Sequence, residues 1–416
     1  MLKTPEGTKS KKQIIEDIYS SQDIQAPIKP GKLGVKWLIY VLLCSFLGGF
    51  VAGFVYFNYF TFLDIEKLGL SSDLAATSTA TQKTPDLNFL LKENTNQEIK
   101  LLAELKQPLV GFYKARPAAS GVFESLYLEK DFLGSGVVIT SDGWVLTHKT
   151  VLNGGNAGIA AVTANRKVFT PEKYVEDKFS GLVLVHLPTT GLSPVKFTST
   201  DLMPASSLLA FRYAVAAGGG EVIKTDLQKI SYHDQSKGED FLLATDLIDR
   251  YYKINQEVAS SFNGAPLLNE QNEVAGLLFA SGKDYINLAV PSYYLKSAVD
   301  KFLSDSQKVA RAGLGVRYLD LSEVFGLSDK IVEGRNKGAV LLGDAKNNIL
   351  AVTKGSAAEK AGLKAGDIIL KVNNEDVDEL NSLTKLLQSY SPNQEINLTV
   401  FRKGEEIQVK VVLGSL

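Results

Sequence analysis

Side chains that could support nucleophilic chemistry gather in two short runs of the chain. The first run places an imidazole, an amine and a hydroxyl side by side at His148, Lys149 and Thr150. The second places two adjacent hydroxyls at Ser260 and Ser261. A serine hydroxyl becomes a nucleophile when a neighbouring base takes its proton, and a lysine can act as that base. A dyad of either serine with Lys149 is therefore one candidate centre for acyl transfer.

Other kinds of chemical site find little support in the sequence. The chain has three histidines in all, and two of them, His186 and His233, fall in a predicted strand and in a polar loop. The three glycines at 218–220 lack the lysine and the strand–loop–helix context of a phosphate-binding loop, so they indicate a flexible loop. No Cys/His spacing is typical of a metal site. We therefore expect no metal and no cofactor.

Length, composition and charge indicate a modular globular protein. The 416 residues predict two or three domains, and 45% hydrophobic with 22% charged residues is typical of packed chains. The formal net charge of −1 argues against binding of nucleic acid. The single cysteine, Cys44, excludes disulfides within the chain, which is compatible with the cytoplasm or a bacterial envelope.

An apolar run near the amino terminus predicts a membrane anchor. Residues 37–57 contain no charge, and a helix of that length, at about 1.5 Å per residue, spans the roughly 30 Å hydrocarbon layer. Seven lysines precede the run, whereas the first charges after it are Asp64 and Glu66. Because basic residues favour the cytoplasmic side, residues 1–36 are predicted to be cytoplasmic and everything beyond residue 60 extracytoplasmic. A cleaved signal peptide is the alternative. Gly49 and Gly53 also permit self-association of the anchor.

The elements that must position the reactive side chains are mostly strands. Residues 58–107 are predicted to be a linker with a membrane-proximal helix. Between 109 and about 290, short apolar runs separated by turn residues predict a barrel or sandwich. Apolar residues at helical spacing predict a helix over 291–303.

The second reactive run resembles the nucleophile turn of the HtrA/Deg family of trypsin-fold serine proteases, usually read GNSGGPLxN. The run at 260–269, SSFNGAPLLN, matches at Gly264, Pro266, the two leucines and Asn269. The resemblance places Asn263 where the family has its nucleophilic serine. An amide nitrogen is delocalised and cannot form an acyl-enzyme.

Two further stretches extend this resemblance. Residues 134–152 are similar to the family's GSGxIIxxDGxILTNxHVV, and residues 182–185 to DLAVL, which place Thr150 at the general base and Gly181 at the orienting acid. The neighbouring ring of His148 is expected to point about 200° away if both residues lie in one tight turn or helix. Ser261 replaces the glycine that shapes the oxyanion hole.

The last hundred residues resemble a bacterial PDZ domain. The run at 354–373 matches the core of that domain, and GLGV at 313–316 resembles its carboxylate-binding loop. In such a loop, consecutive backbone N–H groups converge on a terminal carboxylate, and the following strand accepts a peptide as an added strand. A helix from about 377 to 390 would form the other wall. The predicted peptide-binding residues are Gly313, Leu314, Gly315, Val316, Leu380, Leu383, Thr384 and Leu387.

Together these patterns predict a mostly β protein, with a trypsin-like double β-barrel at 108–304 followed by an α+β PDZ domain at 306–416. The empty triad positions predict a membrane-anchored pseudoprotease, which is not an enzyme and serves as scaffold, adaptor or regulator of envelope protein quality control. Its expected partners are protein C-termini or unfolded envelope proteins, and the resemblance allows a homo-oligomer. The alternative is a serine endopeptidase of the HtrA/Deg type with a rearranged active site. A structural role for the PDZ domain also stays open.

Overall fold

The structure, a computed structural model, describes residues 104–116, 122–152, 158–214, 220–233, 237–281, 285–305 and 308–416. The chain divides into two compact units, Met1–Pro85 and Asp86–Leu416, and every described residue belongs to the second. The predicted anchor at 37–57 lies outside the described residues. Within the described ranges, no helix combines the length and the apolar character that a membrane span requires.

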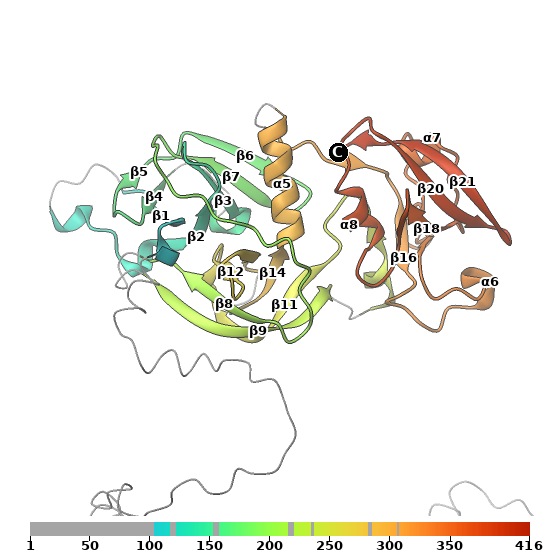
Figure 1. Ribbon diagram of the computed structural model, residues 1–416, viewed down its shortest axis with the longest axis horizontal. Helices are drawn as coiled ribbons and strands as arrows, with labels where there is room; N and C mark the ends of the chain where they lie inside the picture. The colour runs from blue at the N-terminus through green and yellow to red at the C-terminus, as the bar shows by residue number, and fades with distance from the viewer. Residues whose placement is uncertain are drawn as a thin grey trace, which may run out of the picture. The chain divides into compact units, whose positions relative to one another are not determined.

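The first sheet has seven antiparallel strands in the order β5-β4-β1-β2-β3-β7-β6. Three of them, at 109–114, 144–148 and 182–186, are mostly apolar and almost fully buried, since residues on both faces are covered by neighbouring elements. The strands, which Figure 1 shows in blue-green to green, are β1 (Leu109–Lys114), β2 (Phe132–Val138), β3 (Trp144–His148), β4 (Ile159–Thr163), β5 (Val168–Phe169), β6 (Lys173–Asp177) and β7 (Leu182–His186).

The second sheet closes into a six-stranded barrel in the order β11-β14-β13-β12-β8-β9. Helix α5 (Ser292–Ser304) follows its last strand and buries Tyr294, Leu295, Ala298 and Phe302 at the spacing of one helical face. Phe302 meets Trp144 of the first sheet edge to face, so α5 joins the two sheets. The barrel strands are β8 (Ser207–Arg212), β9 (Glu221–Tyr232), β11 (Tyr251–Ala259), β12 (Pro266–Leu268), β13 (Val274–Leu278) and β14 (Tyr285–Pro291).

The carboxyl-terminal part is built on a third sheet with short helices. Its strand order is β10-β16-β17-β18-β20-β21, with β19 beside β18 and a separate pair of β15 with β22. The strands are β10 (Leu243–Ala244), β15 (Ala312–Gly313), β16 (Arg317–Asp320), β17 (Ala339–Leu341), β18 (Ile368–Val372), β19 (Glu375–Asp376), β20 (Glu395–Arg402), β21 (Glu405–Val412) and β22 (Gly414–Ser415). The helices are α6 (Asp329–Val332), α7 (Ala357–Lys360) and α8 (Leu383–Leu387). The predicted mostly β fold class is confirmed.

The predicted helix over 377–390 is wrong in length, because α8 spans only Leu383–Leu387. Asp378 folds the preceding residues into a turn, in which its carboxylate accepts hydrogen bonds from the backbone N–H groups of Leu380 and Asn381. Ser382 then starts the helix by accepting the backbone N–H of Lys385 at 3.1 Å. Two local polar caps therefore replace the first turns of the expected helix.

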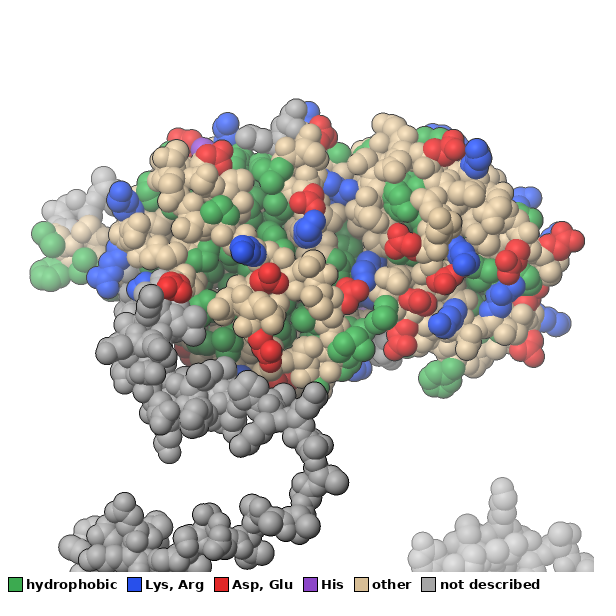
Figure 2. Space-filling model, viewed as in Figure 1, with side chains coloured by type: hydrophobic (Ala, Val, Ile, Leu, Met, Phe, Trp, Pro, Cys, Tyr) green, Lys and Arg blue, Asp and Glu red, His purple; other side chains and the backbone are tan. Residues whose placement is uncertain are grey.

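Among the residues that the structure describes lie five short 3-10 helices. They are η3 (Phe123–Ser125), η4 (Glu129–Asp131), η5 (Lys149–Leu152), η7 (Gly238–Phe241) and η8 (Ser260–Phe262). Two of them matter for chemistry: η5 follows β3 directly and η8 follows β11. Basic and acidic side chains are interspersed over the face of the described residues in Figure 2.

Candidate functional site

The three predicted triad positions converge on one spot between the first sheet and the barrel. The Thr150 hydroxyl donates to Asn263 Oδ1 at 2.7 Å, although 113 residues separate the two in sequence. Asn263 Oδ1 also accepts the backbone N–H of Ala280 at 3.1 Å. Gly181 faces the same spot, since a Cβ built on it would lie 2.8 Å from His148 Nε2. The amide of Asn263 is thus held by two donors from separate elements.

The expected orientation of His148 is wrong. Its Nδ1 lies 2.8 Å from Thr150 Oγ1, so the ring turns toward the convergence point and not away from it. The reason is local structure: His148 is the last residue of β3, whereas Thr150 lies in η5, so the two residues do not share one turn. The structure thus adds an imidazole to the site, in a row of His148, Thr150 and Asn263. In the sequence, the signal for this contact was a histidine two residues before Thr150, the position that aligns with the family's general base.

Burial keeps the His148 imidazole uncharged near neutral pH. The ring is 5% exposed and packs against Phe279 at 4.8 Å between ring centroids. Burial, assisted by the charge of Lys149, lowers the pKa of His148 to about 3. A neutral imidazole has one unprotonated nitrogen. If that nitrogen is Nδ1, it can accept a proton from the Thr150 hydroxyl once this hydroxyl turns away from Asn263 Oδ1, although a pKa of about 3 makes the ring a weak base at neutral pH.

Only glycine fits at position 181, because its backbone is left-handed and the His148 ring lies too close for a side chain. Its φ of +72° lies in the left-handed region, and a side chain there would meet His148 Nε2 at 2.8 Å and Lys149 Cε at 3.2 Å. An acidic residue at position 181 would have a strained backbone and would have to displace the imidazole. The space that an orienting acid would fill is occupied by His148 and by the stem of Lys149.

The backbone around Asn263 is tightly held. The Asn263 N–H donates to the Ser260 carbonyl at 3.1 Å, and the Asn263 carbonyl accepts from Ser135 N–H at 2.8 Å. Gly264 has a φ of +73°, and a Cβ there would fall 2.0 Å from the Ser135 carbonyl oxygen. The Asn263 N–H therefore already has an acceptor within the chain. Of the two candidate serines, Ser260 is exposed and Ser261 half-buried.

The predicted carboxylate-binding loop forms a tight turn beside α7. Gly315 has a φ of +79°, and a Cβ on it would lie 2.4 Å from the Ser356 Cβ. Among the described residues, no hydrogen bond is recorded from the N–H groups of Leu314 and Gly315. The N–H of Val316 binds the Thr245 hydroxyl at 3.2 Å. Two donors of the loop therefore stay available to an anion.

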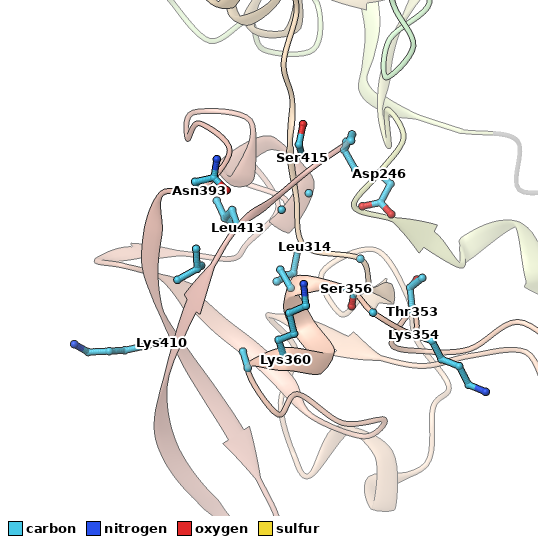
Figure 3. Close-up of a pocket in the computed structure, with 18 residues that line it drawn as sticks. Asp246, Leu314, Thr353, Lys354, Ser356, Lys360, Asn393, Lys410, Leu413 and Ser415 are labelled. Atoms are coloured by element: carbon cyan, nitrogen blue, oxygen red, sulfur yellow. The ribbon is translucent and has the colours of Figure 1, made fainter.

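A pocket opens at this loop (Figure 3). Gly313, Leu314 and Gly315 line it, together with residues of α7 and of the carboxyl-terminal strands. Asp246 also lines the pocket, although it belongs to the segment that precedes β11 in the barrel. The predicted loop residues thus share one cavity with a carboxylate of the chain itself.

Most of the residues predicted to form the helical wall of the groove lie in the core beneath the carboxyl-terminal sheet. Leu383 and Leu387 are fully buried in its hydrophobic core, and Leu380 is 43% exposed. The hydroxyl of Thr384 lies 2.9 Å from that of Tyr318 on β16. The apolar side chains of α8 are therefore already packed inside the domain. Among the described residues, no group of three His, Cys, Asp or Glu side chains could hold a metal ion.

Comparison with protein families matches two segments of the chain. Residues 134–277 match the trypsin-like peptidase domain, and residues 313–413 match the PDZ domain. A "probable periplasmic serine endoprotease DegP-like" from Marinomonas sp. (strain MWYL1) is 30% identical over 68% of this chain and 57% of the relative. A "probable periplasmic serine protease do/HhoA-like" from Haemophilus influenzae is 28% identical over 68% and 58%. The chain thus spans a little over half the length of these curated relatives.

Solved structures share the fold. The "HtrA-type protease AlgW with tripeptide" has a TM-score of 0.53 at 16% identity and covers 76% of this chain and 97% of its own. The "HtrA-type protease AlgW with decapeptide" has a TM-score of 0.52 at 17% identity, with coverages of 76% and 98%. At such identity the likeness establishes the architecture alone.

The prediction that this chain is not an enzyme is contradicted by its relatives. The curated proteins it matches are named serine endoproteases or serine proteases, which points to protease activity. The prediction gave His148 no role, because its ring was expected to point away from Thr150, whereas the structure brings the ring within hydrogen-bonding distance of Thr150.

Proposed function

Because the chain has the HtrA-like architecture of a trypsin-like peptidase domain followed by a PDZ domain, we propose that it binds peptides and protein C-termini through the PDZ domain. The clients are unfolded proteins or the carboxyl ends of proteins outside the cytoplasm. A periplasmic setting for its relatives and an AlgW structure described with a peptide support this proposal.

One observation carries it: the edge of β16 accepts an antiparallel strand. The pairing of Tyr318 with Leu243 and of Arg317 with Ala244 extends the sheet at that edge. The added strand runs toward the loop at 313–316, where two backbone N–H groups remain available. A peptide with a free carboxylate needs the same strand-accepting edge and the same donors.

Peptides that end in an apolar residue with a free carboxylate should bind the full chain in detergent with a dissociation constant on the order of micromolar, because strand addition buries a small area. Amidation of the peptide removes the charge that the loop receives, and it should weaken binding at least tenfold, or about 1.4 kcal/mol. Isothermal titration calorimetry with matched acid and amide peptides measures both values.

Two glycine variants locate the binding. Gly315→Ala should abolish the preference for the free acid, because its Cβ would fall 2.4 Å from the Cβ of Ser356 at the start of α7 and push the loop away from it. Gly404→Ala is the control, since it also has a positive φ, of +89°, but open space around it. Equal binding of acid and amide by the unaltered chain would mean that the PDZ domain is a structural spacer.

The row of His148, Thr150 and Asn263 favours a second function, endopeptidase activity from a rearranged centre. In this proposal the Thr150 hydroxyl turns from Asn263 Oδ1 and gives its proton to His148 Nδ1, 2.8 Å away, as Thr150 Oγ1 attacks the scissile carbonyl. The peptide C–N bond then breaks, the leaving amine takes this proton from His148, and water hydrolyses the acyl-enzyme. The relatives named as serine endoproteases support this function. The dyad of Ser260 or Ser261 with Lys149 is the competing nucleophile.

Hydrolysis of casein by the full chain should separate these centres. Thr150→Val keeps the shape of the side chain and removes the hydroxyl, so it should reduce turnover by at least 100-fold, as should His148→Gln. Ser260→Ala and Ser261→Ala should retain turnover. Loss of activity in a serine variant, together with fluorophosphonate labelling of the unaltered chain, would assign the nucleophile to that serine instead.

We also propose that residues 37–57 anchor the protein, with residues 1–36 in the cytoplasm. In a Cys44→Ser background, a cysteine at Ser10→Cys should stay unlabelled by an impermeant thiol reagent in intact spheroplasts. A cysteine at Lys403→Cys, in the exposed turn between β20 and β21, should react. Labelling at position 10 in sealed spheroplasts would contradict this orientation.

A further inference from the structure

The edge strand of the PDZ domain is already occupied. Leu243 and Ala244 of β10 pair with Tyr318 and Arg317 of β16, and the ladder continues as Thr245 N–H donates to the Val316 carbonyl at 3.1 Å. β10 comes from the segment of the chain just before barrel strand β11. The edge on which the proposed function depends therefore carries a strand of the chain itself.

An apolar side chain anchors this strand. Leu243 is 7% exposed and belongs to the same hydrophobic core as Tyr318 and Leu383. A peptide added at a sheet edge gains its specificity from alternate side chains that enter pockets, and Leu243 takes such a position. Ala244 and Thr245 are buried as well, whereas Leu247, four residues after Leu243, is 52% exposed.

The end of the strand also imitates a peptide terminus. The segment runs antiparallel to β16, so its carboxyl direction leads to the loop at 313–316. Asp246 lines the loop pocket, and its Oδ1 lies 3.9 Å from the position of a Cβ on Gly313 (Figure 3). It also accepts the Thr245 hydroxyl at 3.2 Å. A side-chain carboxylate thus lines the same pocket as the loop whose N–H groups would receive a terminal one.

We propose that residues 243–246 are an intramolecular ligand of the PDZ domain, so that an external C-terminus binds only after this segment leaves the edge of β16. This inference rests on the proposed peptide binding. When only a fraction of the molecules has the edge free, the apparent affinity for a peptide falls by that fraction. Locking the segment in place should abolish binding, and weakening it should increase affinity.

A disulfide can lock the segment. Because Thr245 donates to Val316, the neighbouring pair of Ala244 and Arg317 falls at the position of an antiparallel ladder where the Cα atoms come closest. Cysteines at Ala244→Cys and Arg317→Cys, in the full chain with Cys44→Ser, are therefore placed to cross-link. The probe is the free-acid peptide Phe-Leu-Leu-Ala-Val, which copies residues 241–244 and ends in an apolar residue of the same shape at the position of Thr245.

Oxidation should weaken binding of this probe at least 100-fold, and reduction should restore it. The pair Thr399→Cys and Gln408→Cys cross-links register partners of β20 and β21 and is the control that should leave binding intact. Leu243→Ala should tighten binding at least tenfold, whereas Leu247→Ala should not change it.

If the cross-linked chain binds the probe as well as the reduced chain does, the proposal of an intramolecular ligand is wrong, whereas peptide binding by the PDZ domain is still supported. If neither the unaltered chain, the Leu243→Ala chain nor the reduced pair binds the probe or any other free-acid peptide, the proposed function fails. The proposal of an intramolecular ligand then fails as well, because the pairing of β10 with β16 would be only a structural contact between the domains.

Discussion

Replacing Arg250 with alanine should lower the free energy of unfolding by about 3–5 kcal/mol, because it would leave buried carboxylates without their cation. Arg250 is 3% exposed, and its guanidinium lies 2.6 Å from Asp320 and 3.3 Å from Glu323. It also donates to the carbonyl of Glu379 at 2.5 Å. These partners lie in the carboxyl-terminal domain, whereas Arg250 directly precedes β11 of the barrel.

The charges in this cluster depend on one another. Burial lowers the pKa of Arg250, but the neighbouring charges of Asp249, Glu323 and Asp320 outweigh it and raise the pKa. Burial raises the pKa of the Asp320 carboxyl, and Arg250 partly offsets this effect. Without the arginine, Asp320 would face the full cost of burial next to Glu323.

Urea denaturation followed by circular dichroism measures the loss. Arg335→Ala is the matched control, since Arg335 forms an ion pair with Glu406 at 3.1 Å in which the arginine is 29% and the carboxylate 54% exposed, against 3% for Arg250. Exposed pairs contribute less than about 1 kcal/mol. If Arg250→Ala cost no more than Arg335→Ala, the buried cluster would not be holding the two domains together.

The second large effect is a loss of stability in mild acid caused by His148. Its pKa is about 3 in the folded protein, where burial and the charge of Lys149 disfavour the protonated form, against 6.5 in the unfolded chain. The unfolded state therefore binds more protons below pH 6.5. The stabilisation is complete above pH 6.5 and is lost as the pH falls toward about 3, at a rate of about 1.4 kcal/mol per pH unit. Between pH 6.5 and 5 the loss should be about 2 kcal/mol.

His148→Gln isolates this contribution, since glutamine does not titrate and keeps a hydrogen-bonding group near Thr150. Carboxylates also lose their charge in the lower part of this range, so the measured quantity is the difference between the unaltered chain and His148→Gln at each pH. That difference should shrink steadily as the pH falls. A difference that stays constant between pH 7 and 5 would mean that the imidazole is accessible to protons in the folded state.

The strands and the domain architecture were predictable because their signals are local. Short apolar runs separated by turn residues predict a barrel or sandwich, and the resemblance of local motifs to HtrA/Deg proteases and PDZ domains implies the trypsin-like and PDZ sheets. The convergence of Thr150 with Asn263 also followed from family motifs, and their hydroxyl and amide do meet at 2.7 Å.

Two features of the sites depend on tertiary structure and could not be predicted. The ring of His148 reaches Thr150 because β3 ends at His148 and η5 begins at Lys149, and apolar patterns in a sequence do not determine such a boundary to the residue. The pairing of Leu243 with Tyr318 joins residues 75 positions apart, and β10 is only two residues long. A strand that short has no periodicity for a sequence to reveal.

Hydrogen–deuterium exchange of the full chain, with and without the free-acid probe, tests most directly whether the edge of β16 is the peptide site. Saturating probe should leave the amides of Arg317–Asp320 protected, because the probe replaces β10 at the same edge. Exchange at residues 243–246 should accelerate at the same time, as the displaced segment enters solvent. Unchanged exchange in both segments while the probe is bound would show that peptides bind elsewhere, and it would contradict the account.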